Sequence, residues 1–172
     1  DLVIDDQDET HKMLRKGEVA GCISSEASPV QGCRAVSIGT MRYRLAASRQ
    51  FVERYGLENP DRESLSGVPT VIFNRKDDLH QVFFKNHFNE AVPNMPIHYI
   101  PSSESFAQAI INGFACGMIP DLQGRPYFDS GELVDLAPGG HVLVNLYWHC
   151  WNIRSTILTE LSRTIRENAS IW

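Results

Sequence analysis

Two serines and a glutamate open a predicted helix in the middle of the chain. Ser102, Ser103 and Glu104 stand before apolar residues at helical spacing, and Gly113 is of the residue type that ends helices. The first N–H groups of a helix have no partner inside it, so with the hydroxyls beside them they can bind a carboxylate. The segment therefore predicts a site for an acid group. Simple capping of the helix by the serines is the alternative, and it stays open.

Carboxylates that could bind a cationic group follow a predicted strand. Asp77 and Asp78 stand after the apolar run 71–73, and Glu104 is the third acidic candidate. A cationic ligand group needs a carboxylate that is partly removed from water. Each of the three also has a structural explanation, because Asp77 or Asp78 can cap a helix and Glu104 favours the helix dipole. Both explanations stay open at this point.

Residues at the ends of the predicted strands are further candidates for ligand binding. In α/β folds the ligand lies at the carboxyl ends of the strands, which would place residues from several strands near one another. The complete set of predicted ligand-binding residues is Ser102, Ser103, Glu104, Asp77, Asp78, Asn74, Ser24 and Met118.

Histidine and cysteine patterns predict neither a catalytic site nor a metal site. His80 and His87 are seven residues apart and could share one helix face, but metal sites usually need three or four converging ligands. His149 and Cys150 are neighbours in a predicted strand, so their side chains point to opposite faces. We therefore expect no metal, no cofactor and no enzymatic activity.

Composition excludes several classes of protein. The 172 residues carry 16 Lys and Arg against 21 Asp and Glu, a formal net charge of −5 that repels a phosphate backbone. We therefore expect no DNA binding by this chain alone. No apolar run approaches the roughly 20 residues that span a bilayer, and no signal segment opens the chain. The cysteines form no CxxC pair, which favours buried, reduced thiols and a cytoplasmic location.

Hydrophobic periodicity predicts strands that alternate with helices. The pattern indicates an α/β fold with largely parallel sheets, because the helices would cross over between the strands. In the helix expected at 78–88, the inward face would be Leu79, Val82 and Phe83. Strands or extended segments are expected at residues 1–6, 19–24, 34–47, 69–74, 97–100, 116–119, 131–136 and 141–148. Helices are expected at residues 8–16, 49–55, 61–67, 78–88, 102–112 and around 157–165.

Two long extended segments divide the chain. The segments near 44–47 and 142–146 could carry the chain from one lobe to another and back, which predicts two lobes joined by a hinge. We expect lobe I to comprise residues 1–46 and 143–172, and lobe II to comprise residues 47–142.

Four segments carry a resemblance to a known family. In this order they resemble the effector-binding domain of LysR-type transcriptional regulators: Leu14–Val19, Ser102–Pro120, Ser130–Val134 and Leu146–His149. The resemblance implies a two-lobed fold of the type 2 periplasmic-binding-protein class, with a small effector bound between the lobes. It also implies a homodimer or homotetramer. DNA would be bound only through an N-terminal winged helix-turn-helix domain absent from this chain, and RNA polymerase would be contacted by the full-length regulator.

Within the family, residues 77–81, 102–106 and 146–149 most resemble the branch that controls export of basic amino acids. The resemblance implies lysine and arginine as effectors, and it makes the candidates above effector-binding residues.

The chain departs from the family pattern in two places. The family's domain begins one strand and one helix earlier, so lobe I should lack its first strand and leave an unpaired edge beside the segments that start at residues 1 and 19. Gly124-Arg125-Pro126 should interrupt the helix expected after Pro120, because proline removes an N–H and clashes with the preceding turn.

A free solute-binding protein of a transport system would share this fold and is the alternative function. The segment before this chain would discriminate, since a regulator has a helix-turn-helix there and a transport protein has a signal peptide. An enzyme is a third interpretation, but no acid–base pair or nucleophile pattern supports it. Tyr147, Trp148 and Trp151 could cover the core or a dimer face, and the sequence does not decide between them.

Overall fold

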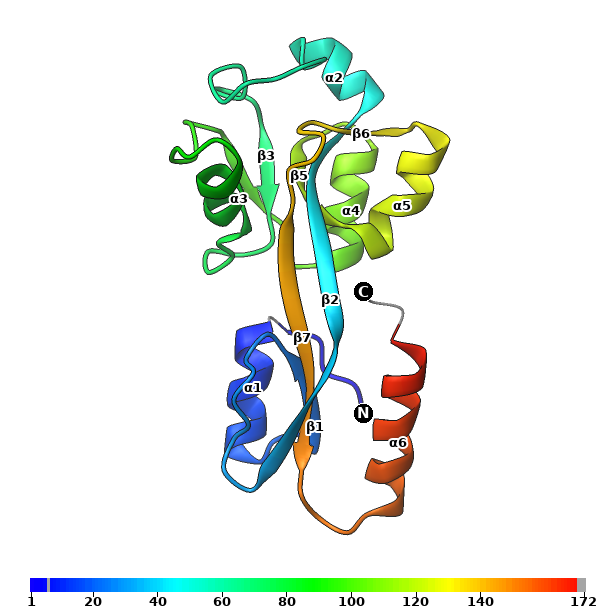
Figure 1. Ribbon diagram of the computed structural model, residues 1–172. Helices are drawn as coiled ribbons and strands as arrows, with labels where there is room; N and C mark the ends of the chain where they lie inside the picture. Colours follow the sequence, from blue (N-terminus) through cyan, green and yellow to red (C-terminus); the bar gives the residue numbers. More distant parts are fainter. Residues whose placement is uncertain (6, 170–172) are drawn as a thin grey trace. The chain divides into compact units, whose positions relative to one another are not determined.

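The computed structural model describes residues 1–5 and 7–169 (Figure 1). Its chain forms two compact units. Unit 1 comprises Asp1–Met41 and Val144–Trp172, and unit 2 comprises Arg42–Leu143. Two long strands contribute to both units, β2 (Cys33–Ser48) and β7 (Val142–Trp151).

Unit 1 combines its parts of β2 and β7 with three further elements. These are α1 (Gln7–Lys16), β1 (Gly21–Ser24) and α6 (Thr156–Asn168). β1 pairs antiparallel with β7, and α1 and α6 cover opposite faces of the strands (Figure 1). The α6 side carries a core cluster of Ile38, Leu146, Trp148, Cys150 and Leu158. The indole N–H of Trp148 donates to Ser162 Oγ at 2.9 Å, so this aromatic residue belongs to the core.

The predicted opening strand is wrong. Residues 1–5 form no strand, and the side chains of Leu2 and Ile4 are 95% and 88% exposed. Within the described residues β1 pairs only with β7, so no parallel β–α–β unit forms at this end. The apolar run 2–4 is typical of a strand, but a strand also needs a neighbour that pairs with its N–H and C=O groups.

Unit 2 is a mixed sheet with helices on both faces. Its strands, besides β2, are β3 (Thr70–Ile72), β4 (Ile97–Tyr99), β5 (Cys116–Pro120) and β6 (Leu133–Asp135). Its helices are α2 (Arg49–Tyr55), α3 (Leu79–His87), α4 (Ser103–Ile111) and α5 (Asp121–Ser130). The predicted α/β class is confirmed.

The predicted largely parallel sheet is wrong. Parallel pairing is found for β3 with β4 and with β5, whereas β2 runs antiparallel to β5 and β6, and β1 antiparallel to β7. A parallel pair needs a long crossover connection, usually a helix, and β2 follows β1 through a loop instead.

Apolar side chains fix the helices of unit 2 on the sheet. One cluster comprises Ala46, Val71, Phe106, Ala107, Ile110, Ala115, Ile119 and Leu133. Tyr127 and Phe128 of α5 pack against it, so α4 and α5 lie on the same face. α3 lies on the opposite face (Figure 1). The predicted inward face of α3 is partly wrong, because the buried residues are His80, Phe83 and Phe84. The side chain of His80 points inward because it hydrogen-bonds Thr70 of β3.

Residues 61–67 form turns rather than the predicted helix. Oδ1 of Asp61 accepts hydrogen bonds from the backbone N–H of Ser64 at 2.8 Å and from the Ser64 hydroxyl at 2.5 Å. The aspartate therefore closes a turn with the same local contact that would begin a helix.

Helix α5 runs unbroken from Asp121 to Ser130, so the predicted interruption at 124–126 is wrong. Pro126 lies inside the helix and lacks the N–H that would reach the Leu122 carbonyl one turn earlier. Leu122 belongs to the first turn and is 59% exposed, so water can hydrate that carbonyl and a single lost bond does not end the helix.

Candidate functional site

The carboxyl ends of three parallel strands meet at one edge of the unit 2 sheet. β3 lies between β4 and β5 and runs parallel to both. The N–H of Ile100 donates to the Ile72 carbonyl at 3.1 Å, so the ends of β3 and β4 lie side by side. We call the segments 73–78, 100–104 and 120–121 the carboxyl edge of unit 2. Ligands of α/β sheets bind at such edges.

The predicted serine cap is confirmed, and it is made by Ser102. Its hydroxyl accepts the Ser105 N–H at 3.4 Å, and its φ of −148° is that of a helix cap. Ser103 is the first helical residue, and its exposed hydroxyl contacts no partner within the described part of the chain. Glu104 is exposed, and its Oε1 accepts from the Gln108 side chain at 3.5 Å. The start of α4 therefore offers one hydroxyl that capping does not use.

In the turn after β3, Asp77 and Asp78 have different roles. Oδ1 of Asp77 accepts the Leu79 N–H at 3.0 Å, and Oδ2 accepts the Phe73 N–H at 3.2 Å. Asp78 occupies the cap position of α3, but its exposed carboxylate makes no capping hydrogen bond. Of the two, Asp78 is the carboxylate that a ligand could contact.

Asn74 and Arg75 complete this turn. Oδ1 of Asn74 accepts the N–H groups of Lys76 at 2.7 Å and of Asp77 at 3.1 Å. The guanidinium of Arg75 lies 4.7 Å from the centroid of the Tyr99 ring, a cation–π contact between the neighbouring strand ends. Asn74 therefore shapes the turn, and a ligand contact by its side chain stays a prediction.

Ser24 and Met118 are both buried. Ser24 belongs to β1 of unit 1, and its hydroxyl accepts the Glu26 N–H at 3.2 Å. Met118 belongs to β5 of unit 2, where it pairs with Leu45 and is 2% exposed. Ligand contacts by these two residues stay predictions.

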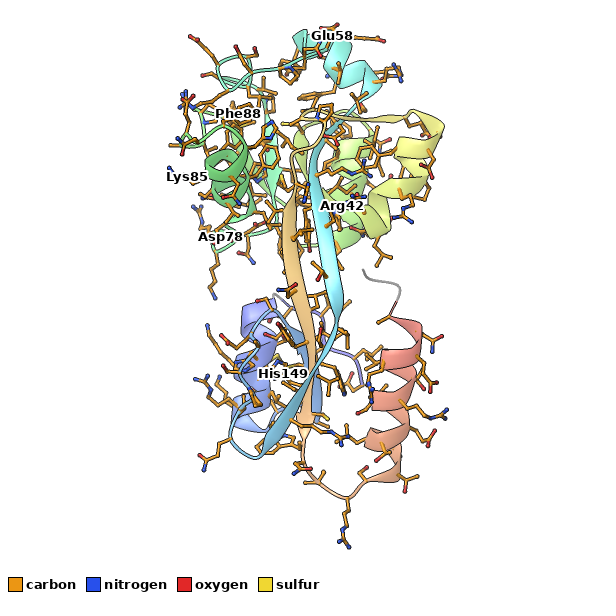
Figure 2. The ribbon with its side chains drawn as sticks, viewed as in Figure 1. Arg42, Glu58, Asp78, Lys85, Phe88 and His149 are labelled. Atoms are coloured by element: carbon orange, nitrogen blue, oxygen red, sulfur yellow. The ribbon has the colours of Figure 1, made fainter. Side chains whose placement is uncertain are left out.

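An ion-pair network that we did not predict from the sequence lies at the same edge. Asp121, the first residue of α5, is 3% exposed and accepts from two arginines of β2. Nε of Arg42, the residue labelled on β2 in Figure 2, donates to Oδ2 at 2.5 Å. Nε of Arg44 donates to Oδ1 at 2.6 Å. Two arginines on the same face of a strand are a signal, but their acidic partner becomes visible only with the β2–β5 register, in which Tyr43 pairs with Pro120.

Arg44 also reaches two other groups. Its guanidinium lies 3.7 Å from the centroid of the Phe128 ring, and its Nη1 lies 3.8 Å from Oδ2 of Asp135. The pKa of Asp135 is raised, mainly because burial disfavours the charged form, although the Ala137 N–H and Arg44 oppose this effect.

Titratable groups elsewhere are suited to structure rather than to catalysis. Burial raises the pKa of Cys22 to about 11 and that of Cys116 to about 12, so both thiols are protonated at neutral pH. His80 is buried and His87 is exposed, so the two histidines do not form a common site. Within the described residues, no group of three or more His, Cys, Asp and Glu side chains is arranged to hold a metal ion.

None of the described helices combines the length and apolar character needed to cross a membrane. A surface hollow of about 540 Å³ lies beside α3, and none of the predicted ligand-binding residues lines it. Its lining residues are Gln81, Lys85, Asn89, Glu90, Ala91 and Val92.

Comparison with known proteins supplies the family. The family model of the LysR substrate binding domain matches residues 1–168. The chain is 37% identical over 168 residues to the HTH-type transcriptional regulator ArgP of Photobacterium profundum, covering 98% of this chain and 56% of that protein. The chain thus spans about half the length of the curated relatives that it matches.

Solved structures agree with the family match. ArgP from Mycobacterium tuberculosis has a TM-score of 0.90 and 34% sequence identity, over 99% of this chain and 58% of that chain. Full-length LysG from Corynebacterium glutamicum, with the effector Arg bound, has a TM-score of 0.85 and 28% identity, over 98% of this chain and 57% of that chain. The fold and the resemblance that the sequence predicted are confirmed.

Proposed function

Because the chain belongs to the LysR substrate-binding domain family, we propose that it senses a small effector, lysine or arginine, for a LysR-type transcriptional regulator. The observation that carries the proposal is the similarity over nearly the whole chain to LysG, whose structure holds Arg as its effector. The ArgP relatives support the same function.

The carboxyl edge of unit 2 offers groups suited to both ends of a basic amino acid. The Ser103 hydroxyl and the first N–H groups of α4 would bind the α-carboxylate. Asp78 and Glu104 are exposed carboxylates that would contact the cationic side chain. Asp77 and Asn74 would hold the turn in place, since their side chains already accept backbone N–H groups.

Effector binding would act through two lobes. We assign residues 1–46 and 143–172 to lobe I and residues 47–142 to lobe II, and the division of the chain into two compact units supports this assignment. A ligand that contacts both lobes favours one arrangement by its differential affinity for that arrangement.

The full-length regulator would be a cytoplasmic homodimer or homotetramer that is not an enzyme. It would bind DNA through a winged helix-turn-helix domain and contact RNA polymerase. The names of the ArgP relatives, which describe HTH-type transcriptional regulators, support the DNA-binding part of this proposal.

Calorimetric titration tests the proposal directly. The chain is titrated with L-lysine, L-arginine and, as a control, L-leucine. We expect saturable binding of the two basic amino acids only. Equal binding of L-leucine, or no binding of either basic amino acid, would refute the proposed effector class.

A further inference from the structure

Asp121 fixes the orientation of the Arg42 side chain at the carboxyl edge of unit 2. The Nε and Nη2 groups of Arg42 both face Oδ2 of Asp121. These two groups form one of the two edges of the guanidinium that can bind a carboxylate side-on. The other edge, formed by Nη1 and the second hydrogen of Nη2, points elsewhere.

The second edge of this guanidinium is not used by the protein. Within the part of the chain that the structure describes, Asp121 is the only hydrogen-bond and ion-pair partner of the Arg42 side chain, which is 40% exposed. A guanidinium has five N–H groups in a fixed plane, so three of them remain for another acceptor. An arginine already held by one carboxylate loses little conformational freedom when it binds a second one.

Asp121 does not depend on Arg42 for its counter-charge. Arg44 donates to the other carboxylate oxygen at 2.6 Å, and its side chain is 21% exposed, about half the exposure of Arg42. Arg44 is also packed on Phe128. The more buried arginine thus neutralises Asp121, and the more exposed one keeps donors for a ligand.

The donors of Arg42 and those of α4 lie at the same edge of the unit 2 sheet. Helices α4 and α5 follow the parallel strands β4 and β5, pack against each other on the same face of the sheet, and begin at the same edge (Figure 1). Asp121 is the first residue of α5 and contacts Arg42, so the Arg42 guanidinium lies at the start of the helix that packs beside α4.

We propose that Arg42 donates to the α-carboxylate of the effector through its Nη1 and Nη2 groups, and that Asp121 is the positioning residue that orients it. The inference rests on the proposed function, since it names a further specificity residue of the same site. It predicts that the chain recognises the acid group of a basic amino acid through a full positive charge as well as through the Ser103 hydroxyl and the start of α4.

The test compares two ligands that differ in the acid group. L-Arginine and agmatine, which lacks the carboxylate, are titrated into the chain and its variants by calorimetry. In Arg42→Gln we expect the affinity for L-arginine to fall by roughly 10- to 100-fold, as for loss of a charge-assisted hydrogen bond, and that for agmatine to change less than about threefold. Arg42→Lys keeps the charge beside Asp121 and should lose less.

Arg49→Gln is the matched control. Arg49 lies after the other end of β2 and donates to the Gly131 carbonyl at 3.1 Å, so its loss should leave both affinities unchanged. Two outcomes would overturn the role of Arg42 while leaving the sensor function intact. One is an equal loss of affinity for both ligands in Arg42→Gln, and the other is an unchanged preference for L-arginine over agmatine in both Arg42 variants. If the unaltered chain binds no basic amino acid, both proposals fail.

Discussion

Nε2 of His80 lies 2.9 Å from Oγ1 of Thr70 in the interior of unit 2. The Thr70 hydroxyl has a single proton and donates it to the Cys116 carbonyl at 3.0 Å. His80 must therefore donate through Nε2–H, which leaves Nδ1 without a proton. Nδ1 is buried and has no partner in the described structure. A proton there would be an unpaired donor in the interior, so burial lowers the pKa of His80 to about 4.

The first prediction is a loss of stability in acid that depends on His80. The folded-state pKa of about 4 lies below the unfolded value of about 6.5. The contribution of His80 is therefore fully present above pH 6.5 and is lost as the pH falls toward 4, by about 3 kcal/mol in total. Urea unfolding of the chain and of His80→Gln at pH 7.5, 5.5 and 4.5 measures the difference in free energy of unfolding.

His141→Gln is the control, because His141 is exposed. This variant should keep the pH dependence of the unaltered chain. If His80→Gln also kept it, the proton responsible for the acid loss would belong to another group, such as His149, whose pKa is lowered mainly by burial.

A second prediction concerns Asp121. Asp121→Asn keeps the size of the side chain but leaves Arg42 and Arg44 without their carboxylate. Removing one member of a buried ion pair leaves uncompensated charge, and the partial exposure of both arginines reduces the cost to about 2 kcal/mol. Denaturant unfolding measures this loss. Asp129→Asn, at an exposed position of the same helix, should change the free energy of unfolding little, and an equal effect of both substitutions would contradict the role of the network.

Substitutions of Gly17 and Gly21 in unit 1 should distinguish the cost of backbone strain from the cost of steric crowding. A Cβ at Gly21 would collide with the Trp148 ring and lie 2.9 Å from the His149 carbonyl oxygen, whereas one at Gly17 would contact nothing within 4 Å. Gly17 has a φ of +74°, so Gly17→Ala should cost only about 1 kcal/mol from backbone strain. Gly21→Ala should cost about 2–3 kcal/mol, because the strand or the indole must move. Thermal unfolding of both variants checks the order, and the reverse order would show that β1 yields easily.

Local signals explain which parts of the fold were predictable. The sequence predicts that Ser102 caps a helix, and its hydroxyl accepts the Ser105 N–H. It also predicts that Gly113 ends this helix, and Gly113 has a φ of +73°. Each of these features depends on residues within one or two turns, so the sequence alone contains the information.

The parts that the sequence missed depend on distant partners. Arg42 and Asp121 are 79 positions apart, and their ion pair exists because β2 is antiparallel to β5 in one particular register. The inward rotation of His80 likewise depends on Thr70, a residue of the preceding strand. Side-chain pairing across strands follows from register, which single-sequence periodicity does not specify.

The two aspartates of the 73–78 turn should separate stability from ligand preference. Asp77→Ala removes acceptors of the Leu79 and Phe73 N–H groups and should cost about 1–2 kcal/mol in unfolding free energy. Asp78→Asn removes an exposed charge that makes no capping hydrogen bond, so it should leave the free energy of unfolding unchanged. It should weaken the binding of L-lysine more than that of the neutral analogue norleucine. Unfolding and calorimetric titration test the pair. An unchanged preference for L-lysine in Asp78→Asn would remove Asp78 from the site.

Substitutions of Ser102 and Ser103 at the start of α4 should likewise affect either stability or binding of the effector's acid group. Ser102→Ala removes the helix cap and should lower the free energy of unfolding by about 1 kcal/mol. Ser103→Ala removes a hydroxyl that has no partner in the described structure, so stability should change little while the Kd for L-arginine rises several-fold. Denaturant unfolding and calorimetry on both variants give the comparison. If Ser103→Ala left the Kd unchanged, the acid group would be held by other donors, and both serines would serve the helix alone.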